Sequence, residues 1–203
     1  MPNQPARRRP DPEALAWPAL CALLGIGAIA AGLTADPQRL VWNAADWTTN
    51  PWTLWSASLV HLSAGHLGIN LAALALIAML GMLLHARLDA ALALLLVWPL
   101  VTLALLAWPQ LGAYCGMSGL LNAMLALLCV QAAAVPVRRR WALWLLAGQA
   151  LKLAGEQGWS QPLAFDASWG FDVAYAAHLA GALGGALAGL LCAAVRRSRC
   201  HRP

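Results

Sequence analysis

The stretch LDAALALLLVWPLVTLALLAW, residues 88–108, contains a single charged side chain, that of Asp89. A helix of about 20 apolar residues is long enough to cross the ~30 Å hydrocarbon core of a bilayer. Five further apolar runs occur, at about residues 16–34, 58–84, 114–135, 140–157 and 174–195. The sequence therefore predicts an all-α membrane protein, a bundle of six transmembrane helices.

Composition agrees with this class. Of the 203 residues, 61% are hydrophobic and 10% are charged, whereas a soluble domain has roughly 25% charged residues. Six spans use about 120 residues, which leaves no room for an extramembrane domain. We expect an N-terminal tail over residues 1–15, a six-helix membrane domain over 16–195 and a basic tail over 196–203.

The positions of the basic residues predict the orientation. If the N-terminus is cytoplasmic, eleven of the thirteen Lys and Arg residues fall in inner segments, as the positive-inside rule requires. They are Arg7, Arg8, Arg9, Arg87, Arg138, Arg139, Arg140, Arg196, Arg197, Arg199 and Arg202. Both termini are then cytoplasmic. The net charge of +5 is explained by this distribution, and we expect a bilayer rather than a nucleic acid as the partner.

The first apolar run could instead belong to a secretory signal peptide, because three arginines precede it. Its length, from Trp17 to Leu33, exceeds a usual signal core of 7–15 residues, so a transmembrane helix is favoured. The loop that follows contains four tryptophans, which are typical of a segment resting in the outer headgroup layer. They are Trp42, Trp47, Trp52 and Trp55.

Three sets of polar residues interrupt the apolar runs, and each needs a reason, because polar groups at membrane depth are costly. In the predicted topology all three sets lie at the outer ends of the second, fourth and sixth spans. The first set is His61, His66 and Asn70, the second is Gly116, Ser118 and Gly119, and the third is His178, Gly181 and Gly185.

Helical spacing suggests what each set could do. Asn70 follows His66 by four residues, so both side chains share one face and could donate to one point. His61 lies off that face, and we expect a supporting role for it. Ser118 begins a helix, where unpaired backbone N–H groups favour negative charge. A packing contact between small residues explains Gly116 and Gly119 about equally well.

The third set is a histidine followed by a ridge of small residues. Gly181, Gly185 and Gly189 allow another helix to approach closely, and a packing seam alone would account for them. Close packing against the fourth span would also bring the imidazole of His178 within hydrogen-bond reach of the Ser118 hydroxyl. A nucleophilic serine needs such a base.

The remaining polar residues and motifs say less about function. Lys152 and Glu156 form an i, i+4 pair, which we interpret as structural, with a proton or ion pathway as the alternative. The chain has no HExxH zinc motif, no GxGD motif of aspartyl intramembrane proteases and no CxxC spacing among its five cysteines. We therefore expect no metal and no cofactor.

At these residues the sequence resembles the rhomboid family of intramembrane serine proteases. The motifs are H-x4-H-x3-N from His61, G-x-S-G from Gly116 and A-H-x2-G-x3-G from Ala177. The resemblance implies Ser118 as nucleophile and His178 as general base. It also implies an oxyanion hole formed by His66, Asn70 and the Ser118 backbone N–H, with Gly116 beside it.

The chain departs from the family pattern at two points. The first outer loop reads NPWTLW, without the Trp-Arg pair that the family often has. Asn122 stands four residues after the serine, where an aromatic residue is common.

The segments YCGMSGLLN and LKLAGEQ are most similar to the rhombosortase subgroup. That similarity implies a bacterial inner-membrane enzyme whose active site faces the periplasm. Its substrates would be transmembrane proteins with a C-terminal sorting signal, made of a Gly-Gly-like motif, a hydrophobic span and a basic tail. A catalytically inactive relative that binds membrane helices, or a small transporter, remains an alternative.

Overall fold

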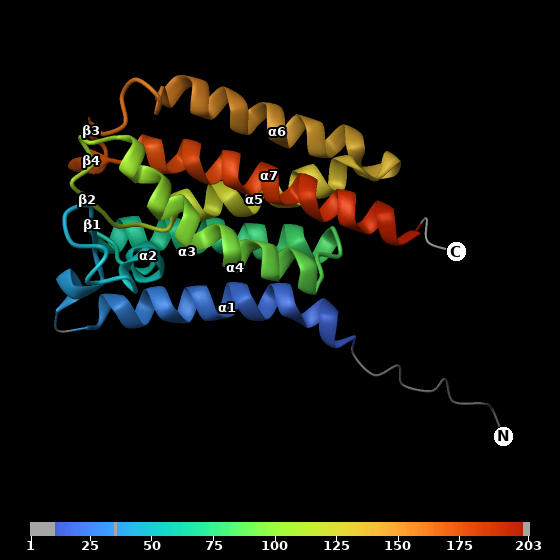
Figure 1. Ribbon diagram of the computed structural model, residues 1–203, viewed down its shortest axis with the longest axis horizontal. Coiled ribbons are helices and arrows are strands. Elements are labelled where there is room, and N and C mark those ends of the chain that lie inside the picture. Colours follow the sequence, from blue (N-terminus) through green and yellow to red (C-terminus); the bar gives the residue numbers. More distant parts are fainter. Residues whose placement is uncertain (1–10, 35, 201–203) are drawn as a thin grey trace.

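Six long helices lie side by side in a bundle (Figure 1). The computed structural model describes residues 11–34 and 36–200; Arg7, Arg8, Arg9 and Arg202 of the predicted cytoplasmic segments lie outside this range. The long helices are α1 (Pro12–Gly32), α3 (Ala64–Leu83), α4 (Leu88–Leu103), α5 (Ser118–Ala133), α6 (Pro136–Glu156) and α7 (Tyr175–Cys200). The expected all-α class is confirmed.

Short elements gather at one end of the bundle, on the left in Figure 1, opposite the end where α1 begins and α7 ends. They are η1 (Pro37–Leu40), β1 (Trp42–Asn43), α2 (Thr53–Ser56), η2 (Ala57–Leu59), η3 (Ala104–Ala107), β2 (Ala113–Tyr114), β3 (Ala164–Asp166) and β4 (Phe171–Val173). β1 pairs antiparallel with β2, and β3 with β4. We refer to this end as the strand end.

The apolar run over residues 58–84 is divided in the structure rather than forming one helix. Its first residues belong to η2 and to an extended segment, and α3 begins only at Ala64. Ser63 sets this boundary, because its extended backbone and its hydroxyl, which accepts from the His66 N–H at 3.1 Å, cap the helix. His61 therefore lies in the loop before α3.

The long helices differ in whether their length and apolar composition suit a membrane span. Within the described residues, four helical segments are long and apolar enough to span: Pro12–Gly32, Ala64–Leu83, Leu88–Ala107 and Tyr175–Ser198. α5 is apolar but has 16 residues. α6 has 21 residues and carries charges near both ends. The short α5 and the charged α6 supply residues to the polar cluster described below.

α5 is the centre of the bundle. Twelve of its 16 residues are buried, whereas α6 buries only Ala142 and Gln149. α7 packs on α5 through glycines: a Cβ added at Gly181 would collide with the carbonyl oxygen of Gly119, and one at Gly185 with that of Ala123. The two backbones are therefore in direct contact, as small residues permit in membranes.

Ion pairs link the helices at the end opposite the strands. Arg87, before α4, contacts Asp11 at 3.1 Å and Glu13 at 2.7 Å, and Arg196 of α7 contacts Asp89 at 2.6 Å. These side chains are half exposed, so each pair contributes little to stability.

The contact between α5 and α7 generates a prediction for Gly185→Ala. The added methyl group must push the backbones apart, and we expect a loss of about 3 kcal/mol of unfolding free energy, at the upper end of overpacking costs. Thermal unfolding of the purified protein in detergent measures this. Gly148→Ala on α6 is the control, because nothing lies within 4 Å of its added Cβ. Equal midpoints for the two variants would contradict the packing described.

Candidate active site

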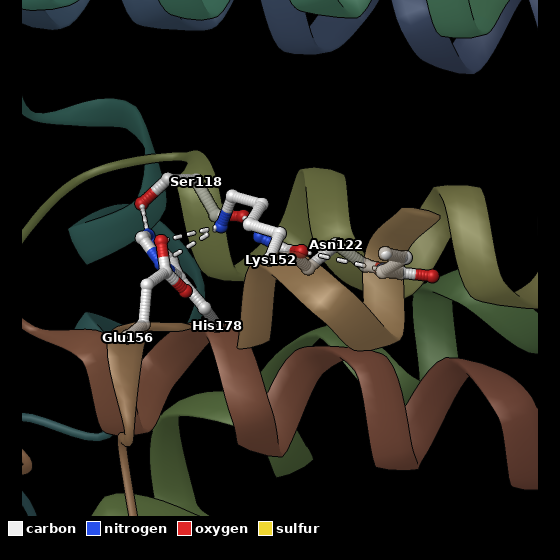
Figure 2. A network of polar contacts seen from close by, with 6 residues as sticks. Ser118, Asn122, Lys152, Glu156 and His178 are labelled. Atoms are coloured by element: carbon white, nitrogen blue, oxygen red, sulfur yellow. Dashed lines mark hydrogen bonds and ion pairs between the residues drawn. The ribbon is translucent and has the colours of Figure 1, made fainter. Parts of the chain in front are cut away.

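Ser118 and His178 meet at the strand end of the bundle (Figure 2). Ser118 is the first residue of α5, and His178 lies in the first turn of α7. The distance between His178 Nε2 and Ser118 Oγ is 2.8 Å, which is a hydrogen bond from the hydroxyl to the ring nitrogen if Nε2 carries no proton. The His178 side chain is 8% exposed. The helix packing thus brings together two residues that are 60 positions apart in the sequence.

Hydrogen bonds and close packing hold the glycines on either side of Ser118 in place. Gly116 has a φ of +120°, a conformation that glycine adopts without strain. Its N–H donates to the Ala57 carbonyl at 3.0 Å, and its own carbonyl accepts from the buried Tyr114 hydroxyl at 2.7 Å. Gly119 packs against Ala177, where a Cβ would lie 2.9 Å from the carbonyl oxygen. These contacts fix where the first turn of α5 presents the Ser118 hydroxyl and the Ser118 backbone N–H.

His66 lies next to this segment. A Cβ at Gly116 would be 3.1 Å from His66 Cε1, so the imidazole occupies the space that glycine leaves. The β3–β4 hairpin also packs against the ring, with ring-centroid distances of 5.2 Å to Phe171 and 5.9 Å to Trp169. His66 is therefore held close to the residues that precede Ser118.

Asn70 and His61 support His66. Asn70 is 4% exposed, and its Nδ2 donates to the His66 carbonyl at 2.9 Å, which uses one of its two amide hydrogens. The ring of His61 contacts that of His66 edge-on at 5.0 Å. His61 Nδ1 lies 3.1 Å from the Leu59 carbonyl, and burial lowers the pKa of His61, which favours a neutral ring.

The sequence did not connect Glu156 and Lys152 with His178. Glu156 Oε2 lies 3.0 Å from His178 Nδ1, on the opposite side of the ring from Ser118. Lys152 Nζ donates to the other carboxylate oxygen, Oε1, at 2.7 Å and lies 3.3 Å from His178 Nδ1. The interpretation of an isolated structural pair was incomplete. The available signal in the sequence was that Glu156 and His178 both fall at the outer ends of their predicted spans, residues 140–157 and 174–195.

Asn122 and Gln149 join α6 to the serine. Asn122 Nδ2 donates to the Ser118 carbonyl at 2.9 Å. Gln149 Nε2 donates to the Asn122 carbonyl at 2.9 Å and to its Oδ1 at 3.2 Å. Nothing in the sequence singled out Gln149. Both side chains are buried, so their mutual hydrogen bonds avoid the cost of unpaired polar groups.

The Ser118 hydroxyl, the His178 imidazole and the Glu156 carboxylate thus follow one another in a chain of polar contacts. This is the arrangement that activates a serine as a nucleophile. No group of three His, Cys, Asp or Glu side chains suited to a metal ion occurs in residues 11–34 and 36–200. Gly181 and Gly185 take no direct part and act through helix packing.

Comparison with known protein families gives one finding. A family model described as Rhomboid domain matches residues 48–195. A search of curated proteins finds no match. The matched region is well over half of the chain, and it contains Ser118, His178, Glu156 and the residues around His66. The chain is therefore a multi-pass membrane protein that belongs to the rhomboid family, the family of intramembrane serine proteases.

Proposed function

We propose that this protein is an active intramembrane serine endopeptidase in which Ser118 is the nucleophile and His178 the general base. The observation that carries the proposal is the 2.8 Å contact between Ser118 Oγ and His178 Nε2. As Oγ attacks the substrate carbonyl, its proton passes to Nε2. That proton then goes to the leaving amine, and water hydrolyses the acyl-enzyme with the same imidazole as base.

The tetrahedral intermediate needs hydrogen-bond donors for its oxyanion. We assign this role to the Ser118 backbone N–H, to His66 and to Asn70, beside Gly116. The place of Ser118 in the first turn of α5 supports the backbone donor, and the packing of His66 on Gly116 supports the imidazole. Asn70 has one amide hydrogen that its bond to the His66 carbonyl leaves unused.

The substrates in this proposal are membrane-anchored proteins cut near the outer face of the bilayer. The similarity to rhombosortases favours C-terminal sorting signals with a Gly-Gly-like motif. Such a motif suits the close packing around Ser118, where Gly116 and Gly119 are themselves buried, because a segment without bulky side chains needs the least room. We further propose a bacterial inner membrane, cytoplasmic termini and a site that faces the periplasm.

An inactive relative that binds membrane helices is the alternative, and a small transporter would need polar groups along a path through the bundle. The contact of Lys152 and Glu156 with His178 accounts for the charges that a transport path would have used. The experiments below separate an enzyme from an inactive binder.

Ser118→Ala and His178→Ala should each lower cleavage by about 10⁴-fold or more, because nucleophile and base act as a unit. A fluorophosphonate probe should label the wild type at Ser118 and fail to label Ser118→Ala. The matched control is Ser160→Ala, because the Ser160 hydroxyl is exposed and donates to the Gln157 carbonyl at 3.2 Å, within its own turn. Undiminished turnover in either site variant would exclude this pair, and a wild type that never labels would favour the inactive binder.

His66→Ala and Asn70→Ala test the oxyanion donors. Loss of one donor should lower kcat by about 10²–10³-fold, or roughly 2.7–4 kcal/mol. The kcat of each purified variant measures this, and the melting temperature should change only modestly. If Asn70→Ala cleaves normally but melts many degrees lower, its hydrogen bond to the His66 carbonyl is its main role.

The orientation can be measured by labelling single cysteines in a cysteine-free background with an impermeant reagent. Asn50→Cys and Ser168→Cys, at the strand end, should react from outside the intact cell. Arg139→Cys, at the start of α6, should react only after the membrane is permeabilised. Outside labelling of Arg139→Cys would reverse the proposed orientation.

A further inference from the structure

The Glu156 carboxylate contacts the His178 imidazole. Glu156 is the last residue of α6, its side chain is 16% exposed, and Oε2 lies 3.0 Å from His178 Nδ1. Figure 2 shows the imidazole between the Ser118 hydroxyl and this carboxylate. A largely buried carboxylate in a membrane protein is costly unless it is paired, so its presence here needs an explanation.

The register of α6 explains how the carboxylate reaches the ring. Gln149, Lys152 and Glu156 are spaced by three and four residues, so they share one face of α6. Gln149 binds Asn122, one turn beyond Ser118 on α5, and Glu156 reaches His178 on α7. α6 buries little else. Its polar face therefore aligns it with the two helices that carry the serine and the histidine.

We propose that Glu156 is a positioning residue that makes the site a Ser118–His178–Glu156 triad rather than a serine–histidine pair. This inference rests on the proposed function. To accept the serine proton, Nε2 must be free, so the ring proton must be on Nδ1. An ionised carboxylate only accepts hydrogen bonds, so Glu156 Oε2 selects the tautomer with Nδ1–H and fixes the plane of the ring.

Lys152 stabilises the ionised form of Glu156. Its ammonium binds Oε1 at 2.7 Å, so each carboxylate oxygen has one partner and the charge of Glu156 is balanced. Without the carboxylate, the ammonium 3.3 Å from Nδ1 would donate to that nitrogen. This would move the ring proton to Nε2 and block the base. Glu156 therefore also keeps Lys152 from imposing the inactive tautomer.

The proton balance of the step is simple. The O–H bond of Ser118 breaks, and an N–H bond forms at His178 Nε2. The serine oxygen gains a bond to the substrate carbonyl carbon, whose π bond breaks, and that electron pair moves to the carbonyl oxygen as the oxyanion. Glu156 remains ionised throughout and faces the resulting imidazolium, whose charge it stabilises. Leaving-group protonation returns His178 to its starting tautomer.

The test compares Glu156→Gln with Glu156→Asp by the rate of fluorophosphonate labelling at Ser118. Glutamine keeps the size of the side chain, but its amide can donate to Nδ1, so we expect labelling about 10²-fold slower or more. Aspartate keeps the charge but is one methylene shorter, and we expect a rate between those of the wild type and Glu156→Gln. Melting temperatures should stay close to that of the wild type. Glu13→Gln is the matched control, because Glu13 pairs with Arg87 at the opposite end.

The outcomes separate this inference from the proposed function. Labelling of Glu156→Gln at the wild-type rate overturns the triad and leaves the serine–histidine pair intact. Equally slow labelling of both variants, with an equal loss of melting temperature, also overturns it, because the residue is then structural. If Glu156→Gln does not fold, a folded Glu156→Asp must label at least about tenfold more slowly than the wild type, and an unchanged rate overturns the inference. A wild type that is not labelled at Ser118 contradicts the proposed function itself.

Discussion

The backbone contact between α5 and α7 determines the distance between the serine and the histidine. Gly181 and Gly185 leave no side chain between the helices, so the first turn of α7 lies beside the first turn of α5. In a bilayer, where lipid is as apolar as the helix surfaces, such close contact is a principal source of association. A larger residue at either glycine would separate Ser118 from His178 before it affected any other part of the site.

Much of this arrangement follows from the sequence, because it depends on local patterns. The apolar runs predicted the long helices, and the spacing of small residues after His178 indicated the helix that packs on α5. The start of α3 at Ala64, inside the apolar run over residues 58–84, and the Ser63 hydroxyl that caps it were not predicted. Glu156 was missed for a different reason: its i, i+4 partner Lys152 offered a complete local explanation. Only the position of α6 against α7 shows that one carboxylate oxygen faces the imidazole.

α6 differs from the other long helices in how it is attached. α5 and α7 interact over their length through buried apolar surface and backbone, whereas α6 buries only Ala142 and Gln149 and reaches its neighbours through polar groups. Hydrogen bonds specify register more sharply than apolar contacts, since a shift of one residue would unpair them. Asn122, where an aromatic residue is common in the family, takes part in this attachment by binding both Ser118 and Gln149.

The three polar partners come from the last three helices of the chain, with Ser118 on α5, Glu156 on α6 and His178 on α7. A chain is made from its N-terminus, so α5 leaves the ribosome before α6 and α7. Under the proposed mechanism, the serine then has no base until the last helix has entered the bundle. An incomplete chain would therefore be unable to cut neighbouring proteins, and cleavage could begin only when assembly is finished.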